Sequence, residues 1–401
     1  MTNFQANDNS CLYPNYKRVN IDFSYGQGSY LYTTDGEEFL DFTSGIAVNT
    51  LGHSHPYLVA KIQEQSTKLW HISNLFPIAP QEILAKRLCE YSFANSVFFA
   101  SSGTEAVECA IKTARHYYYS QGKHEKYYII SFCGAFHGRT LGSLAATGRP
   151  KYSAGFGPVC PGFKQFNPED AKEELEASLY DMVQKTAAII IEPIQGESGI
   201  NVISNDFLQF LRNFCTENDI LLIFDEIQTG IGRTGTLFAY EQTGVTPDII
   251  TLAKGLGGGF PISACLCGKD IAKDMKPGTH GATFGGNFLA TTVANAVLDI
   301  VTKPDFLSQV KIQSNFLQTG LKELTNKFSH IINTLQGRGL LLGLKTNIDT
   351  EKLITACREQ KLLTLGADNN VMRLIPALNI NQSESSLALK KLEAALISLN
   401  T

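Results

Sequence analysis

Short apolar runs alternate with amphipathic stretches through the middle of the chain, and this alternation limits the possible folds more than any other feature. Several of the runs are apolar on both alternating faces, as strands covered by helices on each side must be. Two of the stretches between them, residues 104–120 and 204–218, place their apolar residues on one helical stripe. The alternation predicts an α/β fold with a large, mostly parallel sheet. We expect its strands at residues 96–100, 127–132, 187–192, 220–225, 248–253 and 262–267.

The two ends of the chain have a different pattern. Residues 28–42 have the form of a hairpin that turns at Asp35-Gly36, a dipeptide typical of tight turns. A long helical pattern covers residues 287–328. In the tail that follows, strands and helices alternate again, at residues 339–345, 351–360, 371–375 and 384–399. These shorter, mixed elements predict an α+β unit rather than a continuation of the large sheet.

The change of pattern predicts two domains. We expect a large domain at residues 50–290, and a small α+β domain that combines residues 1–49 with residues 291–401. A length of 401 residues is enough for two or three domains, and a chain of this size can bury a core without disulfides or metals.

Composition excludes several classes of function. The chain has 34 Lys and Arg against 38 Asp and Glu, a net charge of −4, which argues against nucleic-acid binding. No run approaches the roughly 18 apolar residues of a membrane span, and the first ten residues lack the basic and apolar parts of a secretion signal. The nine cysteines have no metal-site spacing. We therefore expect reduced thiols in a cytoplasmic protein without a bound metal.

Two carboxylates follow the strand predicted at residues 220–225. Asp225 and Glu226 come after five apolar residues, which places them at the carboxyl end of a buried parallel strand, where open α/β sheets bind ligands. One alternative is an ordinary acidic turn in contact with solvent. Another is the metal-binding strand of an ATPase, but the chain has no Gly-x-x-x-x-Gly-Lys-Ser/Thr phosphate loop. The ATPase interpretation therefore fails.

A lysine stands at the end of the strand predicted at residues 248–253. Lys254 is followed by Gly-Leu-Gly-Gly-Gly, and such glycines leave room for a flat ligand or a close backbone approach. Burial of an ammonium group is costly unless its pKa falls or it forms a covalent bond. A lysine in this position is of the type that forms a Schiff base with an aldehyde. The alternative is a surface lysine in a glycine-rich turn.

Small hydroxyl residues connect the strand predicted at residues 96–100 with the helix that follows it. Residues 101–105 read Ser-Ser-Gly-Thr-Glu, so a helix begins directly after the strand. The free N–H groups and the partial positive charge of a helix start suit a phosphate. The same residues are also a good capping pattern with no ligand at all.

Together, these three features fit one cofactor. Pyridoxal phosphate needs an amine for its aldehyde, a carboxylate for its ring nitrogen and a pocket for its phosphate. Lys254, Asp225 and the helix start after Ser102 supply one of each. The combination is far more specific than any single member, and it predicts pyridoxal 5′-phosphate as the cofactor.

Eight motifs in a fixed order carry a resemblance to a known family. With them the chain resembles the class III aminotransferases, which include the ornithine and acetylornithine enzymes, along nearly its whole length. The stretches Ala-Val-Asn-Thr-Leu-Gly-His at residues 47–53 and Trp-His-Ile-Ser-Asn-Leu-Phe at residues 70–76 are most similar to the acetylornithine type. The motifs are SGIAVNTLGHSHP at residues 44–56, FFASSGTEA at 98–106, FHGRT at 136–140, EPIQGE at 192–197, FDEIQTG at 224–230, KGLGGG at 254–259, TFGGN at 283–287 and RLIP at 373–376.

The resemblance implies the fold of the aspartate aminotransferases, fold type I of the pyridoxal-phosphate enzymes. It implies that Lys254 carries the cofactor and moves the proton at the substrate carbon. It also implies that Asp225 keeps the ring nitrogen protonated and that Gln228 bonds to the phenolic oxygen of the ring. His137 and His280 lie in cofactor-proximal motifs without an evident acid–base role.

The resemblance assigns further cofactor contacts and a subunit arrangement. Gly103 and Thr104 bind the phosphate through the helix start, and Phe136 stacks on the face of the ring. Thr283 reaches the phosphate from the partner subunit, so the resemblance implies that the active unit is a homodimer.

Substrate recognition depends, by the same resemblance, on two arginines and a glutamate. Arg139 holds the substrate carboxylate that is furthest from the reacting amine, because a guanidinium fork suits a carboxylate. Arg373 takes the α-carboxylate of glutamate, and we expect Glu197 to neutralise Arg373 when the other substrate is bound. Ala282 replaces a serine that contacts substrate in many acetylornithine enzymes, and Ser198 replaces a frequent glycine.

The resemblance thus implies transamination of N2-acetyl-L-ornithine with 2-oxoglutarate, which gives N-acetyl-L-glutamate 5-semialdehyde and L-glutamate in arginine biosynthesis. Ornithine, succinylornithine, N-succinyl-diaminopimelate and 4-aminobutyrate are alternative amine donors, since substrate choice depends on few side chains. A protein that binds the cofactor without catalysis is an alternative of a different class.

Overall fold

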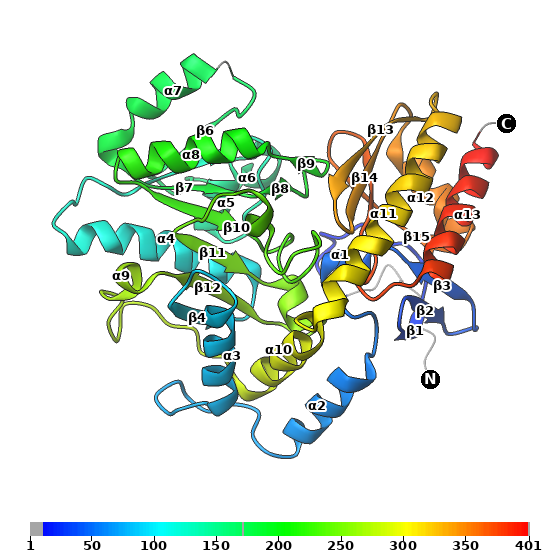
Figure 1. Cartoon of the computed structure of the whole chain (residues 1–401), viewed down its shortest axis with the longest axis horizontal. Helices are drawn as coiled ribbons and strands as arrows, with labels where there is room; N and C mark the ends of the chain where they lie inside the picture. The colour runs from blue at the N-terminus through cyan, green and yellow to red at the C-terminus, as the bar shows by residue number, and fades with distance from the viewer. Residues whose placement is uncertain (1–10, 171, 400–401) are drawn as a thin grey trace.

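A seven-stranded sheet forms the centre of the larger part of the computed structural model, which describes residues 11–170 and 172–399 (Figure 1). Neighbouring strands are parallel, except that β12 pairs antiparallel with both β11 and β4. The predicted α/β fold with a mostly parallel sheet is therefore confirmed. In spatial order the strands are β4 (Ser96–Ala100), β12 (Ser263–Cys267), β11 (Ile249–Leu252), β10 (Leu221–Asp225), β7 (Thr186–Ile191), β5 (Tyr128–Phe132) and β6 (Phe163–Phe166).

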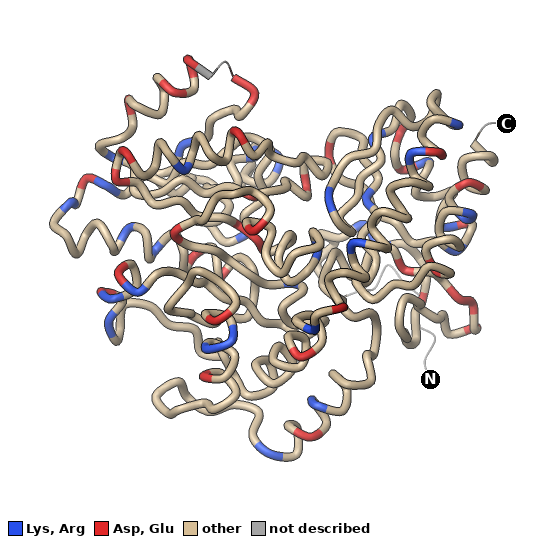
Figure 2. The backbone as a smooth tube through the Cα atoms, in the orientation of Figure 1, with Lys and Arg blue, Asp and Glu red and all other residues tan. Residues whose placement is uncertain are grey.

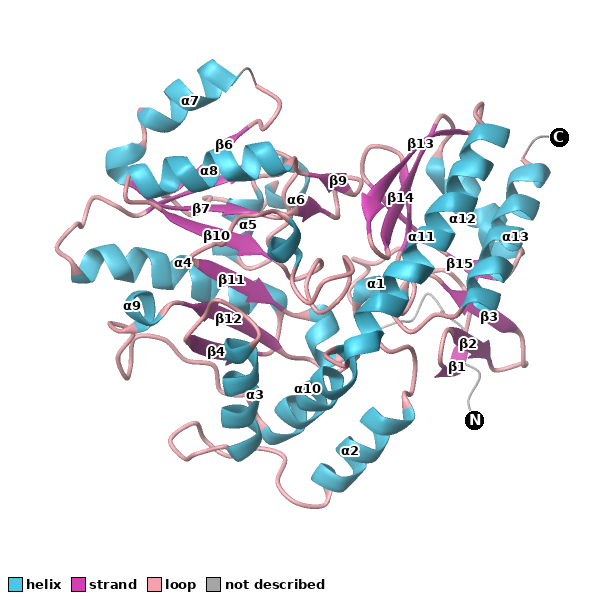
Figure 3. Ribbon diagram, in the orientation of Figure 1, coloured by secondary structure: helices cyan, strands magenta, loops and turns pink. Residues whose placement is uncertain are grey.

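Alternate side chains of the central strands enter two different cores. Ile189 and Leu222 lie in a core with α8, whereas Ile190 and Ile223 lie in a core with α4. Because helices cover both faces, the strands need to be apolar throughout, which is the pattern that predicts them. Figure 3 shows the sheet between its helices. The helices that supply these two cores are α3 (Ala79–Glu90), α8 (Asn205–Glu217) and α10 (Phe288–Val301) for the first and α4 (Gly103–Ser120) for the second.

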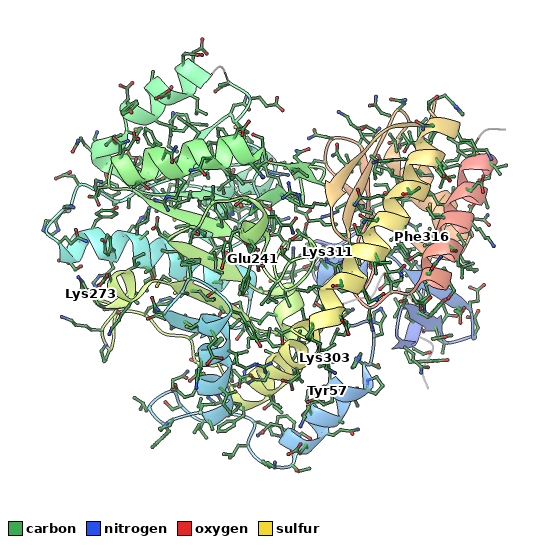
Figure 4. The ribbon with its side chains drawn as sticks, viewed as in Figure 1. Tyr57, Glu241, Lys273, Lys303, Lys311 and Phe316 are labelled. Carbon is green, nitrogen blue, oxygen red and sulfur yellow. The ribbon has the colours of Figure 1, made fainter. Side chains whose placement is uncertain are left out.

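Shorter elements complete the larger part. Helix α2 is held against α10 by the Tyr57 hydroxyl, which donates to Asp299 Oδ2 at 2.9 Å (Figure 4). Helix α1 (Ser44–Ala47) lies in the first 49 residues, which the predicted division gives to the smaller domain. The short elements of the larger part are α2 (Pro56–Ser66), α5 (Leu141–Thr147), α6 (Pro150–Ser153), α7 (Lys172–Tyr180), α9 (Lys269–Ala272), the 3-10 turns at Val183–Lys185, Ala239–Gln242 and Lys254–Gly257, and a pair of strands, β8 (Ile194–Gln195) and β9 (Asn201–Val202).

The smaller part combines both ends of the chain. Leu40 and Phe42 share a hydrophobic core with Leu342 and Met372, so the amino-terminal strands pack with the carboxyl-terminal elements. One sheet has the order β1 (Phe23–Gln27), β2 (Tyr30–Thr33), β3 (Glu38–Asp41), β15 (Leu362–Leu363), and the other has the order β13 (Ile332–Arg338), β14 (Leu341–Thr346), β17 (Val371–Leu374), β16 (Leu365–Ala367). Their helices are α11 (Pro304–Lys327), α12 (Thr350–Glu359) and α13 (Gln382–Ser398).

The helical pattern of residues 287–328 forms two helices that belong to different cores. Helix α10 contributes Val297 and Val301 to the large core, and α11 contributes Leu317 and Leu321 to the small one. Pro304 begins α11, where its missing N–H costs nothing. We propose the two-domain division predicted above, with its second boundary between α10 and α11 rather than after residue 290.

Charges of both signs are interspersed over both parts of the molecule (Figure 2). Within the described residues, no helix is both long and apolar enough to cross a bilayer. All nine cysteines lie in the described residues, and each of them is a free thiol. The first ten residues, on which the expectation about a secretion signal depends, lie outside the described residues.

Candidate active site

The predicted cofactor residues meet at the carboxyl ends of the central strands. Strands β10 and β11 are parallel and in register, with Asp225 opposite Thr251, and both point toward the smaller part of the molecule (Figure 3). A cavity of about 380 Å³ opens at this edge of the sheet. Its lining includes eight of the predicted residues: Gly103, Thr104, Phe136, Arg139, Glu197, Asp225, Gln228 and Lys254.

Asp225 is fixed by three donors. Its side chain is 3% exposed, and its Oδ2 atom lies 2.7 Å from Nδ1 of His137. The other oxygen, Oδ1, accepts from the backbone N–H of Ile227 at 3.1 Å and from the Thr251 hydroxyl at 3.2 Å. A carboxylate only accepts, so Nδ1 of His137 carries the proton of that contact. The carboxylate therefore has one orientation at the edge of the cavity.

Lys254 begins a 3-10 turn with a strained backbone. Its φ of 39° lies in the left-handed region, which is costly for a residue other than glycine and is found where function demands it. The side chain lines the cavity. Desolvation lowers the pKa of its amine, and the nearby Glu197 carboxylate opposes this shift only in part. A lowered pKa leaves more of the amine neutral, the form that attacks an aldehyde.

The start of helix α4 closes another side of the cavity. Residues Ser101 and Ser102 connect β4 to α4, and Glu105 Oε2 accepts from the N–H of Ser101 at 3.0 Å and from the Ser102 hydroxyl at 2.8 Å. A Cβ at Gly103 would lie 3.0 Å from the Ile227 side chain, so the helix start packs tightly against the loop after β10. The Thr104 hydroxyl contacts Ser143 Oγ at 2.7 Å. Ser102, the N-cap residue of α4, forms no side-chain cap, so the predicted capping pattern is incomplete.

Gln228 carries a buried polar atom without a partner. The residue is 7% exposed and lines the cavity, and its Oε1 atom has no hydrogen-bond partner among the described residues. Burial of an unpaired amide is costly, so its persistence indicates a ligand that satisfies it. A Cβ at Gly196 would lie 1.7 Å from this oxygen, which explains the glycine there.

Glu192 is a buried acid that the sequence analysis did not single out. It is 7% exposed, lines the cavity and accepts the backbone N–H of Phe136 at 2.9 Å. Burial raises its pKa to about 7. The sequence does indicate this position: Glu192 directly follows the apolar strand β7, just as Asp225 lies at the end of the apolar strand β10. His137 gave no comparable signal, since its contact with Asp225 joins residues 88 positions apart.

Glu197 separates Arg373 from the cavity. Arg373 lies on β17, is 3% exposed and does not line the cavity. Its Nη1 atom lies 2.6 Å from Oε1 of Glu197, and Glu197 does line the cavity. Its Nη2 atom donates to the carbonyl oxygen of Gly366 at 2.9 Å. Burial favours the neutral form of Glu197, but the guanidinium of Arg373 outweighs this effect and lowers the carboxyl pKa. The arginine is thus covered by an ionised glutamate.

Arg139 lies at the cavity in a different environment. Its side chain is exposed, and no carboxylate pairs with it among the described residues. The guanidinium carbon lies 4.0 Å from the ring centroid of Tyr152 and 5.5 Å from that of Phe136. Tyr152, on α6, was not singled out by the sequence analysis.

Besides Arg373, two predicted residues lie outside the cavity lining. Thr283 is exposed, and Ala282 is partly buried in the same loop. The loop is tied to residue Asn74, whose Nδ2 atom donates to the carbonyl oxygens of Ala282 at 3.3 Å and Gly285 at 3.1 Å. A single chain therefore does not bring Thr283 to its own cavity.

Comparison with known proteins gives the family of this chain. The family model described as Aminotransferase class-III matches residues 12–396. The chain is a class III aminotransferase. The acetylornithine aminotransferase of Agrobacterium fabrum is 50% identical over 97% of this chain and 96% of its own length. The crystal structure of N-acetylornithine aminotransferase from Stenotrophomonas maltophilia K279a, at 38% identity, has a TM-score of 0.83 and covers 96% of this chain and 98% of its own.

The cofactor of this class III aminotransferase is pyridoxal 5′-phosphate. A structure of the ornithine aminotransferase of Toxoplasma gondii, described with this cofactor at its active site, is 31% identical, with a TM-score of 0.91 over 97% of this chain and 93% of its own. The cavity fits the cofactor in this chain: the unpaired amide of Gln228, the desolvated amine of Lys254 and the fixed carboxylate of Asp225 converge there with the start of α4. Fold type I is likewise confirmed by these neighbours.

Proposed function

We propose that this aminotransferase transfers the terminal amino group of N2-acetyl-L-ornithine to 2-oxoglutarate, giving N-acetyl-L-glutamate 5-semialdehyde and L-glutamate. One observation carries the proposal: acetylornithine aminotransferases from several bacteria are 46–50% identical to the chain over nearly its full length. The intact Arg139, Glu197 and Arg373 set supports it. We also propose that this reaction belongs to arginine biosynthesis.

The chain's own residues divide the work of the reaction. When bound, pyridoxal phosphate supplies an electron-withdrawing ring beside the carbon that carries the substrate amine. Lys254 holds the cofactor and moves a proton at that carbon, for which a lowered amine pKa is suited. Asp225, oriented by His137, keeps a negative charge at the ring nitrogen. Gln228 would hydrogen-bond to the phenolic oxygen of the cofactor, and Phe136 would cover a face of its ring.

Recognition of two unlike substrates rests on the pair of Glu197 and Arg373. Glutamate reacts at its α-carbon, so its α-carboxylate needs a cation beside the reaction centre, and Arg373 supplies one once Glu197 moves away. Acetylornithine reacts at its terminal amine and has no carboxylate there, so Glu197 stays on Arg373 at 2.6 Å. Arg139 takes the distant carboxylate of either substrate through its free N–H edge.

We further propose a homodimer in which Thr283 completes the phosphate site of the partner subunit. Two loops support it. Trp70, Leu75, Phe76 and Phe284 are 61%, 88%, 62% and 62% exposed, and the hydrogen bonds of Asn74 join their loops beside Thr283. Large apolar side chains gathered in this way are typical of a surface that another subunit covers. We also propose a cytoplasmic location, in keeping with nine free thiols.

The proposed activity is tested by comparing kcat/KM for acetylornithine, succinylornithine, ornithine and 4-aminobutyrate, each with 2-oxoglutarate. We expect acetylornithine to be the best amine donor. If ornithine or 4-aminobutyrate is preferred by tenfold or more, the proposed substrate is wrong while the aminotransferase family stands. N-succinyl-diaminopimelate is included as the longest donor.

A cofactor-binding protein without catalysis is the alternative of a different class. The absorbance of the holoenzyme separates the two, because an active aminotransferase loses its yellow band when glutamate donates an amino group. We expect bleaching by glutamate and recovery on addition of 2-oxoglutarate. A yellow band that persists with every amine donor would favour the binding protein.

A further inference from the structure

Tyr152 lies beside Arg139 in a position that no motif assigned. Its ring centroid is 4.0 Å from the guanidinium carbon of Arg139, and its edge meets Phe136 with centroids 5.9 Å apart at an interplanar angle of 83°. Phe136 itself lies in the cavity lining. One aromatic ring therefore touches both the proposed carboxylate clamp and the residue proposed to cover the cofactor.

The short helix that carries Tyr152 is anchored on both sides. Arg149, the N-cap residue of α6, and Lys151 on α6 both form ion pairs with Asp368. Asp368 belongs to the turn between β16 and β17, and its backbone N–H donates to the carbonyl oxygen of Glu197 at 3.0 Å. Arg149 also donates to the carbonyl oxygen of Gly134. These contacts fix the position of the Tyr152 ring relative to both ends of the substrate site.

Stacking leaves the binding edge of Arg139 free. A cation–π contact uses the face of the guanidinium plane, whereas a carboxylate is bound by the N–H groups at its edge. No carboxylate of the described residues pairs with Arg139, so nothing in this part of the chain competes for that edge. A long, exposed side chain held in this way loses less conformational freedom when a substrate carboxylate binds.

We propose that Tyr152 is a positioning residue that holds Arg139 for the distant carboxylate, and so determines how strongly the enzyme prefers amines that carry one. The proposal rests on the proposed function, in which Arg139 binds that carboxylate. It extends that function by naming the residue on which the selectivity depends.

A matched pair of substrates separates this role from a general structural one. N-acetylputrescine is acetylornithine without its carboxylate, with the same amide and the same reacting amine. For Tyr152→Leu we expect kcat/KM for acetylornithine to fall about tenfold through a higher KM, as loss of a cation–π contact predicts. Under the same conditions we expect kcat/KM for N-acetylputrescine to change less than about twofold. Tyr152→Phe keeps the ring and should retain the wild-type ratio of the two substrates.

Controls make each outcome decisive. Tyr119→Leu changes an exposed tyrosine near the far end of α4, about 24 Å along the helix from Gly103, and should leave both substrates as in wild type. Tyr152→Met, which replaces the ring by a flexible apolar chain, is used if the leucine variant is unstable. In an Arg139→Gln background the effect of Tyr152→Leu should largely disappear, because the guanidinium that Tyr152 positions is absent.

Three results would overturn the proposal: an equal loss with both substrates, an unchanged ratio in Tyr152→Leu, or a full effect in the Arg139→Gln background. Failure of the proposed function has a different signature. In that case the wild-type enzyme itself would show no preference for acetylornithine over N-acetylputrescine.

Discussion

Single residues carry the chemistry of this site through their surroundings rather than through their type alone. The chain has many lysines, but Lys254 combines a desolvated amine, a φ of 39° and a position at the end of β11. Asp225 differs from a surface aspartate in having three donors around its two oxygens. The strain and the burial cost stability, and they are tolerated because the large core fixes both strand ends.

Replacement of Lys254 by alanine tests its catalytic role. We expect turnover to fall by at least about 10³-fold, because the variant lacks both the nucleophile and the proton-transferring amine. Cofactor should still bind noncovalently through Asp225, Gln228 and the start of α4. The measurements are the transamination rate and the cofactor retained after gel filtration. Lys273→Ala, at the exposed lysine after α9, is the control and should behave as wild type (Figure 4). Near-normal turnover of the Lys254 variant would remove this residue from the mechanism.

Replacement of Glu197 by alanine tests the proposed switch. Without the carboxylate, Arg373 faces the cavity uncovered in both half-reactions. We expect the KM for glutamate to fall and the acetylornithine half-reaction to slow, so that the ratio of the two rates shifts by about tenfold or more. Stopped-flow absorbance of the cofactor measures each half-reaction separately. Glu351→Ala, at an exposed glutamate of α12, serves as the control. Wild-type rates in both half-reactions of the Glu197 variant would contradict the switch.

At the scale of elements, the sequence predicts what the hydrophobic effect alone determines. The six predicted strands of the large sheet lie within one residue of their predicted ends, because their apolar runs have clear limits and, in all but the edge strand β4, both faces are buried. Strand β13 was missed because Asn333, Thr334 and Gln336 interrupt its pattern, and all but its first residue are partly or fully exposed. The edge strand β6 was missed for the same reason, with only four residues and none of them fully buried.

The site residues divide in the same way, into those that follow a buried apolar strand and those whose position depends on tertiary packing. Asp225 and Lys254 were predictable because each follows a buried strand, and parallel strands bring their carboxyl ends together. His137 and Tyr152 were not, since their contacts depend on how separate segments pack. The placement of Arg373 behind Glu197 also depends on packing, because the first residue belongs to the small sheet and the second to a loop of the large part.

The 3-10 turn at Ala239–Gln242 is held by a buried carboxylate, and this predicts a dependence of stability on pH. Glu226 is 1% exposed and accepts from the N–H groups of Ala239 at 2.6 Å and Tyr240 at 2.8 Å. Burial outweighs these donors and raises its pKa to about 7. A raised carboxyl pKa means that the folded state binds more protons than the unfolded state between about pH 4.5 and 7. The contribution of Glu226 to stability is therefore complete below this range and is lost as the pH rises through it.

The comparison of wild type with Glu226→Gln measures this contribution. Glutamine does not titrate, so the difference in the free energy of unfolding between the two proteins should change with pH by up to about 1.4 kcal/mol per pH unit between pH 4.5 and 7. Urea unfolding at a series of pH values gives the slope. Glu241→Gln is a less suitable partner for comparison, since Lys311 of α11 also affects that carboxyl (Figure 4). Parallel pH profiles of the two proteins would show that Glu226 is ionised throughout.

At the scale of the whole molecule, the site is assembled across two cores. Lys254, Asp225 and the start of α4 belong to the large part, whereas Arg373 comes from the small sheet. Asp368 joins the two, since it pairs with Arg149 at the start of α6 and donates its N–H to the Glu197 carbonyl. A substrate that binds between Arg139 and Arg373 therefore contacts both parts, so their relative position affects affinity as directly as any single contact does.

A third contribution is expected from a second copy of the chain, and subunit mixing tests it. Thr283 is exposed and lies outside the cavity lining of its own chain, so Thr283→Ala should lower activity by loss of a phosphate contact in the partner's site. Lys254→Ala should inactivate the site of its own subunit. In a mixed dimer of the two variants, one site then carries both changes and the other carries neither.

Mixing after reversible dissociation should therefore restore activity to two variants that are each impaired alone. Random pairing of equal amounts makes about half of the dimers mixed, and each mixed dimer has one intact site of its two. We therefore expect about a quarter of the wild-type activity. If Thr283 instead served its own subunit, every site in the mixed dimer would carry one of the two changes, and no activity would return. A double variant, Lys254→Ala with Thr283→Ala in the same chain, mixed with wild type, controls for the exchange itself. Because the two arrangements predict opposite outcomes from the same proteins, the experiment decides whether the active unit is the chain or the dimer.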